Sequence, residues 1–260
     1  MLHDRKTGHM RQPTDASGNR PVIILFTRVP VPGRAKTRLL PVLSAHECAL
    51  LQEAMILDEA EGLGLLGLDL VIYRSDEADN LADADSVNAR FHLRVAEAAP
   101  GVRLCVQTGD DLGSRMESAI DAELGRGAPW CMLLGSDLPL VDDNLIYEAI
   151  GAFGNEDALL CPSDDGGYWL VGLRRSCPAL FEGKRYGTGS VFEEAYHACQ
   201  SSGMGVAIGP VTRDIDTPDD FAWLCDLVRA KDRRVGVRTA ACVRMIAMRM
   251  GLGASAHDSQ

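Results

Sequence analysis

A cationic segment near the start of the chain has the chemistry to bind a polyphosphate. It reads Arg-Val-Pro-Val-Pro-Gly-Arg-Ala-Lys-Thr-Arg over residues 28–38, with four cations in eleven residues. Residues 21–46 contain no acid, although the chain has 37 acids in 260 residues. Arginine holds a phosphate with a bidentate fork, and lysine binds it as a point charge. We therefore expect residues 28–38 to bind an anion; a basic loop that only faces solvent is the alternative.

Two aspartates follow apolar runs, a position that suits a magnesium ligand. Asp137 comes after the apolar run at residues 130–134, within Gly-Ser-Asp-Leu-Pro. Asp216 lies in Asp-Ile-Asp-Thr-Pro at residues 214–218, where Asp214 is a weaker candidate. Proteins usually bind Mg²⁺ through one or two carboxylates together with substrate phosphates. We expect Asp137 and Asp216 to bind a divalent ion, with helix capping as the alternative for Asp137.

Two further segments place glycines beside polar or aromatic residues at expected turns. In residues 107–115, Gln107 or the glycine backbone is a candidate to read a base edge, and helix capping is the alternative interpretation. In residues 163–169, an Asp-Gly turn precedes Tyr168 and Trp169. Asp-Gly turns commonly link hairpin strands. The two aromatics would form a shelf for an acceptor, and a plain hairpin is the alternative.

The elements that must position these residues alternate between strand and helix. Such alternation predicts an α/β layered sheet, whose ligands bind at the carboxyl ends of the strands. Residues 76–100 are polar and weakly periodic and give no prediction. Apolar runs predict strands at residues 22–27, 70–73, 103–108, 130–134, 158–161, 168–173 and 205–208, and the remaining patterns predict helices at 44–62, 112–124, 143–153, 190–201 and from 219.

Composition narrows the class of protein. The formal net charge is −11, which argues against a nucleic-acid binder because such proteins usually present a basic surface. The eight cysteines are at least sixteen residues apart, so they lack zinc-ribbon spacing and indicate a reducing, cytoplasmic location. No apolar run approaches the roughly 18 residues that a membrane-spanning helix needs.

The chain divides into one domain and two tails. Residues 1–20 are polar and are expected to be a disordered tail, and residues 21–228 form the single predicted domain. Residues 229–260 are expected to be a basic C-terminal helix and tail. Seven Arg or Lys residues stand there against one Asp up to residue 250, and a solvated helix face is favoured over a binding arm.

The segments described above, in their order along the chain, resemble those of a bacterial family usually labelled glycosyltransferase-like, within the nucleotide-diphospho-sugar transferase superfamily. The resemblance covers roughly residues 21–228. Residues 35–44 are also similar to the guanylyltransferases that activate phospholactate for deazaflavin cofactor synthesis, which lack the Asp-Gly-Gly-Tyr block found here at residues 165–168. The carrying blocks are residues 26–39, 109–116, 135–139, 165–170 and 214–218.

The resemblance implies a single-domain GT-A/Rossmann-like three-layer sandwich with a mostly parallel mixed sheet, a nucleotide in the crevice and Mg²⁺ or Mn²⁺. By it, Asp137 and Asp216 are metal ligands, and phosphate is contacted by Lys36 together with Arg28, Arg34 and Arg38. Lys36, Arg38 and Asp137 are the predicted catalytic residues. The predicted substrate-binding residues are Arg28, Gly33, Arg34, Thr37, Gln107, Gly113, Arg115, Asp165, Gly166, Gly167 and Tyr168.

The functional hypothesis is a Mg²⁺-dependent transferase that uses a nucleotide and a small-molecule acceptor. Nucleotidyl transfer from an NTP to an acidic or phosphorylated acceptor is favoured, because four cations suit a triphosphate slightly better than a diphosphate. Glycosyl transfer from an NDP-sugar is the alternative, and a non-catalytic nucleotide-binding regulatory protein is the third. No nucleic-acid partner is expected, and a homodimer stays open.

Overall fold

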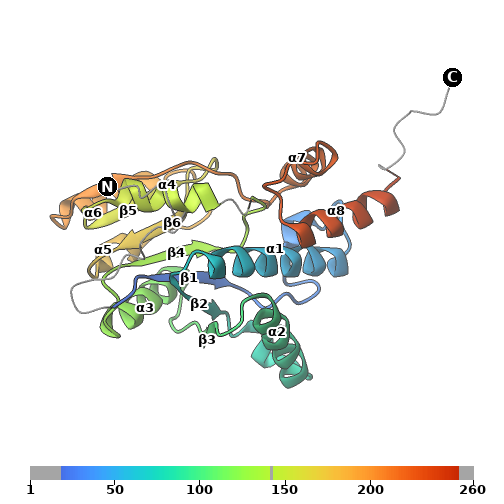
Figure 1. Ribbon diagram of the computed structural model, residues 1–260, viewed down its shortest axis with the longest axis horizontal. Coiled ribbons are helices and arrows are strands. Elements are labelled where there is room, and N and C mark those ends of the chain that lie inside the picture. The colour runs from blue at the N-terminus through green and yellow to red at the C-terminus, as the bar shows by residue number, and fades with distance from the viewer. Residues whose placement is uncertain (1–18, 141–142, 252–260) are drawn as a thin grey trace, which may run out of the picture.

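The computed structural model describes residues 19–140 and 143–251, and these form a seven-stranded sheet (Figure 1). The spatial order is β3-β2-β1-β4-β6-β5-β7. All neighbours pair in parallel except β6, which is antiparallel to both β4 and β5. The mostly parallel mixed sheet is therefore confirmed. The strands are β1 Val22–Thr27, β2 Asp69–Arg74, β3 Arg103–Val106, β4 Cys131–Gly135, β5 Ala158–Pro162, β6 Tyr168–Leu173 and β7 Val206–Ile208.

Helices cover both faces of the sheet and give the predicted three layers. In β1, Ile23 and Leu25 pack with α1, α2 and α4, whereas Ile24 and Phe26 pack with α3, α5 and α6. No helix in the described ranges is long and apolar enough to cross a membrane. The helices are α1 Ala45–Leu65, α2 Ala84–Ala98, α3 Leu112–Gly125, α4 Asp143–Phe153, α5 Pro178–Phe181, α6 Val191–Ser201, α7 Pro218–Arg229 and α8 Val237–Arg249, with 3-10 turns η1 Thr37–Leu39 and η2 Glu77–Asn80.

Some boundaries differ from the sequence prediction. The helix α1 begins after a capping box formed by Ser44 and Glu47, but it continues past Gly62 to Leu65, so the expected end at residue 62 is wrong. The helix α2 lies in the stretch that gave no prediction, and it buries only Phe91, Val95 and Ala98. The predicted tail at residues 1–20 lies almost wholly outside the described residues.

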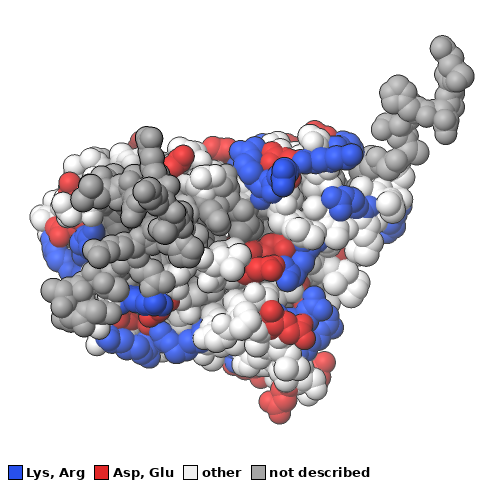
Figure 2. All heavy atoms as spheres, in the orientation of Figure 1, with Lys and Arg blue, Asp and Glu red and all other residues white. Residues whose placement is uncertain are grey.

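The C-terminal helices pack on α1 and form a third apolar cluster with it, around Leu51, Met55 and Ile246. Asp58 of α1 is buried and accepts hydrogen bonds from the first amides of α8, those of Arg238 and Thr239. Figure 2 shows Lys and Arg side chains gathered over the α7 and α8 end of the molecule, as the basic sequence there predicts. The described part of the basic segment therefore shares a hydrophobic core with α1.

A buried carboxylate on α3 ties this helix to β2 and β3. Glu123 accepts hydrogen bonds from the Tyr73 hydroxyl at 2.7 Å, from Arg103 at 3.0 and 2.5 Å, and from Arg126 at 2.8 Å. Burial alone would raise the pKa of Glu123, but the hydrogen bonds from Arg103 and Tyr73 lower it. Glu123 is therefore a buried, charged and fully partnered group.

We expect Glu123→Ala to lower the free energy of unfolding by about 2–3 kcal/mol, because it leaves the Tyr73 hydroxyl and Arg103 without their acceptor. Urea denaturation at neutral pH measures this change. The control is Glu117→Ala on the same helix, which removes an acid whose carboxylate lies near other acids. We expect a change of less than about 0.5 kcal/mol there, and equal losses in the two variants would contradict the proposed role of Glu123.

Candidate functional site

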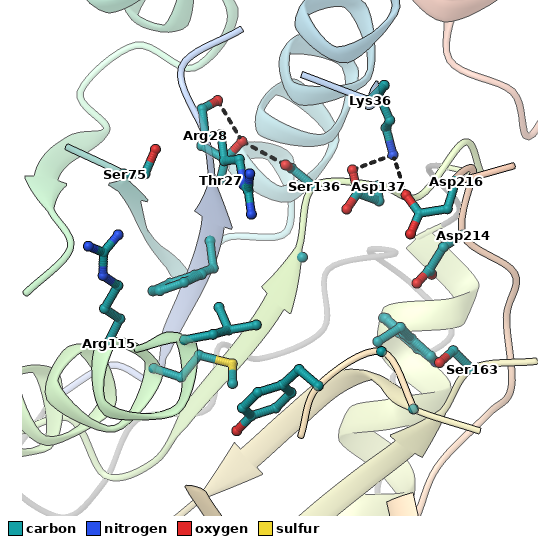
Figure 3. Close-up of a pocket in the computed structure, with 18 of the residues that line it drawn as sticks. Thr27, Arg28, Lys36, Ser75, Arg115, Ser136, Asp137, Ser163, Asp214 and Asp216 are labelled. Carbon is teal, nitrogen blue, oxygen red and sulfur yellow. Dashed lines mark hydrogen bonds and ion pairs between the residues drawn. The ribbon is translucent and has the colours of Figure 1, made fainter. Parts of the chain in front are cut away.

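A cleft of about 780 Å³ opens at the carboxyl ends of the central strands (Figure 3). Thr27 ends β1, Ser75 follows β2 and Asp137 follows β4, and all three line the cleft. Because β6 runs antiparallel, its first residue, Tyr168, reaches the same edge of the sheet. The cleft therefore brings together side chains from all five segments that the sequence singled out.

Most predicted site residues line this cleft. Gly33, Gly113 and Gly166 are absent from its described lining. A side chain at Gly113 would place its Cβ 2.5 Å from the carbonyl oxygen of Phe181, so this glycine permits close packing of α3 on α5. Gly166 has a φ of +84° in the turn before β6. The predicted residues that line the cleft are Arg28, Arg34, Lys36, Thr37, Arg38, Gln107, Arg115, Asp137, Asp165, Gly167, Tyr168, Asp214 and Asp216.

The ammonium group of Lys36 lies between the two aspartates. Its Nζ is 2.5 Å from Asp137 Oδ1, 3.3 Å from Asp216 Oδ1 and 2.5 Å from the carbonyl oxygen of Ile215. Only 2% of the side chain is exposed. Burial alone would lower the pKa of Lys36, but Asp137 and Asp216 raise it above its ordinary value. An ammonium has three N–H donors, so a phosphate would reach Lys36 only in exchange for one of these oxygens.

Asp214 is the third acid at this point, and one of its two carboxylate oxygens lacks a hydrogen-bond partner among the described residues. This oxygen, Oδ1, is buried. Burial, and then the nearby charge of Asp137, raise the pKa of Asp214 to about 7. Figure 3 shows this carboxylate beside that of Asp216, on the side of the cleft opposite Arg115. A cation near Asp214 would give the buried oxygen a partner and would offset the repulsion from Asp137.

These carboxylates fit a hard divalent cation. The Asp137 and Asp216 side chains are 42% and 43% exposed, and each carries a second oxygen that Lys36 does not contact. The second oxygen of Asp216 lies 3.6 Å from the exposed guanidinium of Arg38. Two carboxylates that open onto a cleft match the usual manner of Mg²⁺ binding, in which substrate phosphates complete the coordination. Within the described part of the chain, no three His, Cys, Asp or Glu side chains form a ready-made metal site.

The raised pKa of Asp214 predicts a pH-dependent stability. The folded protein holds this proton up to about pH 7, whereas the unfolded chain releases it near 3.8. The stabilisation is therefore complete below about pH 4 and is lost as the pH rises to about 7. Asp214→Asn cannot ionise, so its unfolding free energy should fall less between pH 5 and 8 than that of the wild type, by about 2 kcal/mol.

Urea denaturation at pH 5, 6, 7 and 8 in EDTA measures this difference. Asp164→Asn is the control, because Asp164 is exposed in the turn beside the cleft. Parallel pH profiles of the wild type and Asp214→Asn would contradict the assignment.

On the other side of the cleft, two predicted residues make contacts with the protein itself. Gln107 donates from its amide nitrogen to the carbonyl oxygens of Thr27 and Tyr73, at 2.8 and 3.0 Å. Only its amide oxygen is left for a base. Arg115 donates to the Gly109 carbonyl at 2.9 Å and pairs with Asp76 at 3.1 Å. Both side chains therefore also brace the loops that form the cleft wall.

Sequence reasoning missed three polar residues of the cleft. Ser75 follows β2, and Gln52 lies on α1. Tyr186 places its hydroxyl 3.4 Å from that of Tyr168. A polar residue within the apolar run of α1 was the available signal for Gln52, whereas the sequence around Ser75 and Tyr186 carries no motif.

Comparisons with known proteins agree with the fold. The solved structure of a Desulfovibrio desulfuricans G20 protein, described provisionally as a nucleotide-diphospho-sugar transferase, is 28% identical, with a TM-score of 0.74. The match covers 88% of this chain and 98% of that one. The resemblance to the nucleotide-diphospho-sugar transferase superfamily is confirmed. A family described as "Uncharacterized protein conserved in bacteria (DUF2064)" matches residues 66–188, which include the Asp137 segment.

A more distant solved structure shares the fold alone. The 4-diphosphocytidyl-2C-methyl-D-erythritol synthase of Anaerococcus prevotii DSM 20548 is 11% identical, with a TM-score of 0.51, and the match covers 81% of this chain and 99% of that one. Rv0371C of Mycobacterium tuberculosis H37Rv, solved in complex with manganese, is 17% identical with a TM-score of 0.46 over 79% of this chain and 98% of that one. No curated protein sequence matches the chain significantly.

Proposed function

We propose that the protein is a Mg²⁺- or Mn²⁺-dependent transferase that moves a nucleotidyl group from a nucleoside triphosphate to a small acidic or phosphorylated acceptor. The observation that carries the proposal is the meeting of the cations of residues 28–38 with Asp137 and Asp216 in one cleft. Its volume of about 780 Å³ lies toward the upper end for ligand sites and suits a nucleotide together with an acceptor.

In the proposed reaction, an acceptor oxygen forms a bond to the α-phosphorus. The bond from the α-phosphorus to the bridging oxygen breaks, and pyrophosphate leaves with the electron pair. A carboxylate or phosphate acceptor is already anionic, so the step needs no catalytic base. Arg28, Arg34 and Arg38 stabilise the negative charge of the polyphosphate. A divalent ion on Asp137 and Asp216 would neutralise the charge that develops on the leaving group.

Glycosyl transfer is the second candidate, and one observation favours it. The Desulfovibrio desulfuricans protein, whose match covers 88% of this chain, is described provisionally as a nucleotide-diphospho-sugar transferase. In that reaction the acceptor oxygen attacks the anomeric carbon of a nucleotide sugar, and the nucleoside diphosphate leaves. The same aspartates and arginines would then stabilise a diphosphate.

Product analysis separates these reactions. The protein is incubated with Mg²⁺, each NTP in turn and a panel of acidic and phosphorylated metabolites, and pyrophosphate is measured. We expect acceptor-dependent pyrophosphate release with one NTP. Slow hydrolysis of an NDP-sugar without pyrophosphate would favour glycosyl transfer, and tight nucleotide binding with neither product would favour a binding protein.

A further inference from the structure

The helix α1 carries two buried polar side chains that point at the Asp137 segment. Gln52 and Glu59 are seven residues apart, which places them on the same face of a helix. They are 5% and 2% exposed. Polar groups are buried at a cost of a few kcal/mol unless they are hydrogen-bonded. The partners of both side chains lie in the segment between β4 and Pro139.

These two side chains hold the backbone on both sides of Asp137. Gln52 donates from its amide nitrogen to the Ser136 carbonyl oxygen at 2.9 Å and to the Ser136 hydroxyl at 3.1 Å. Glu59 Oε1 accepts the amide hydrogen of Leu138 at 3.0 Å. The carbonyl oxygen of Asp137 itself accepts the amide of Ile215 at 3.0 Å. The three contacts fix the backbone around Asp137, whose side chain opens onto the cleft.

Glu59 makes its contact in a buried and acidic neighbourhood, which disfavours a charge on its carboxyl group. Burial raises the pKa of Glu59 well above its ordinary value, and the nearby Asp137 raises it further. Its Oε2 is buried without a hydrogen-bond partner among the described residues. A neutral carboxyl group still accepts the Leu138 amide through its carbonyl oxygen. A glutamine at this position would accept the same hydrogen, whereas a leucine would fill the space and leave the amide unpaired.

We propose that Glu59 is a positioning residue that acts through the Leu138 amide to hold the Asp137 carboxylate toward the cleft and the divalent ion. This inference rests on the proposed function, in which Asp137 binds that ion. Glu59 itself contacts neither the ion nor the substrate. Its effect should therefore be felt in the affinity for the metal–polyphosphate complex, and an amide side chain should replace it.

The test is calorimetric titration of the protein with Mn²⁺ and inorganic tripolyphosphate, a probe that needs no knowledge of the base. Glu59→Leu should weaken binding about 10–100-fold, as loss of a residue that orients a metal ligand does. Glu59→Gln should stay within about threefold of the wild type. Asp58→Asn is the matched control: it perturbs the neighbouring residue of α1, which holds α8, and should lower the melting temperature without changing the affinity.

The outcomes separate the inference from the proposed function. Wild-type affinity in a folded Glu59→Leu variant overturns the inference if Asp137→Ala has lost binding. Equal weakening by Glu59→Gln and Glu59→Leu also overturns it. If Asp137→Ala binds like the wild type, the proposed function falls and the inference falls with it. Should Glu59→Leu fail to fold, Gln52→Leu removes the second anchor and should weaken binding at least fivefold, and unchanged binding there counts against the inference.

Discussion

Asp137→Ala should abolish Mg²⁺-dependent binding of nucleoside triphosphates. The Asp137 carboxylate is 42% exposed on the cleft. Gln52 holds the backbone on one side of Asp137, and Glu59 holds it on the other. If it is a metal ligand, its loss removes a direct bond to the ion. Because residues that merely orient such ligands contribute about 10–100-fold to affinity, we expect a loss of at least about 100-fold.

Nucleotide affinity measured in Mg²⁺ and again in EDTA checks this expectation. Asp137→Asn is the second variant, because its amide oxygen can still accept a hydrogen bond from Lys36 and so preserves the local structure. Asp164→Ala, on an exposed turn beside the cleft, is the control and should bind as the wild type does. Unchanged Mg²⁺-dependent affinity in both Asp137 variants would overturn the assignment.

The arrangement of the site at one sheet edge could be predicted because it follows from the strands. The β1 and β4 runs are apolar except for Thr27, the last residue of β1, because helices cover both faces of these strands. Their ends are therefore recognisable in the sequence, and parallel pairing brings Arg28 and Asp137 to the same sheet edge. The caps at Ser44, Asp111 and Thr217 are also local, since each side chain accepts the amide three residues on. Such contacts are visible in a short stretch of sequence.

What could not be predicted depends on distant contacts. The helix α2 has three buried side chains in fifteen residues, so its apolar periodicity is too weak to read. The helix α1 continues through Gly62 because packing against α2 and α8 outweighs the poor helix propensity of glycine. Nothing in the sequence near Lys36 shows that its ammonium turns toward acids 101 and 180 residues away.

Lys36→Met should raise the affinity for the metal ion alone and lower the affinity for the polyphosphate. In the wild type, the ammonium already neutralises Asp137 and Asp216, so Mn²⁺ alone must compete with a buried, charged lysine. Methionine has a similar length but no charge, and we expect it to raise the affinity for Mn²⁺ alone about tenfold or more. A tenfold change corresponds to about 1.4 kcal/mol, which is modest for a charge pair this close.

With nucleotides the same variant should bind more weakly. When metal and triphosphate arrive together, the ion can take over the aspartates and release Lys36 to a phosphate oxygen. Lys36→Met should therefore lose more affinity for a triphosphate than for the matching nucleoside, and equal losses would argue against a phosphate role. Arg244→Met, on the exposed face of α8, is the control for loss of a cation.

Without metal, Lys36→Met should also melt at a lower temperature than the wild type, since three carboxylates then face one another. Mn²⁺ should restore the melting temperature. A variant that gains nothing from Mn²⁺ in either measurement would show that Asp137 and Asp216 do not hold the ion.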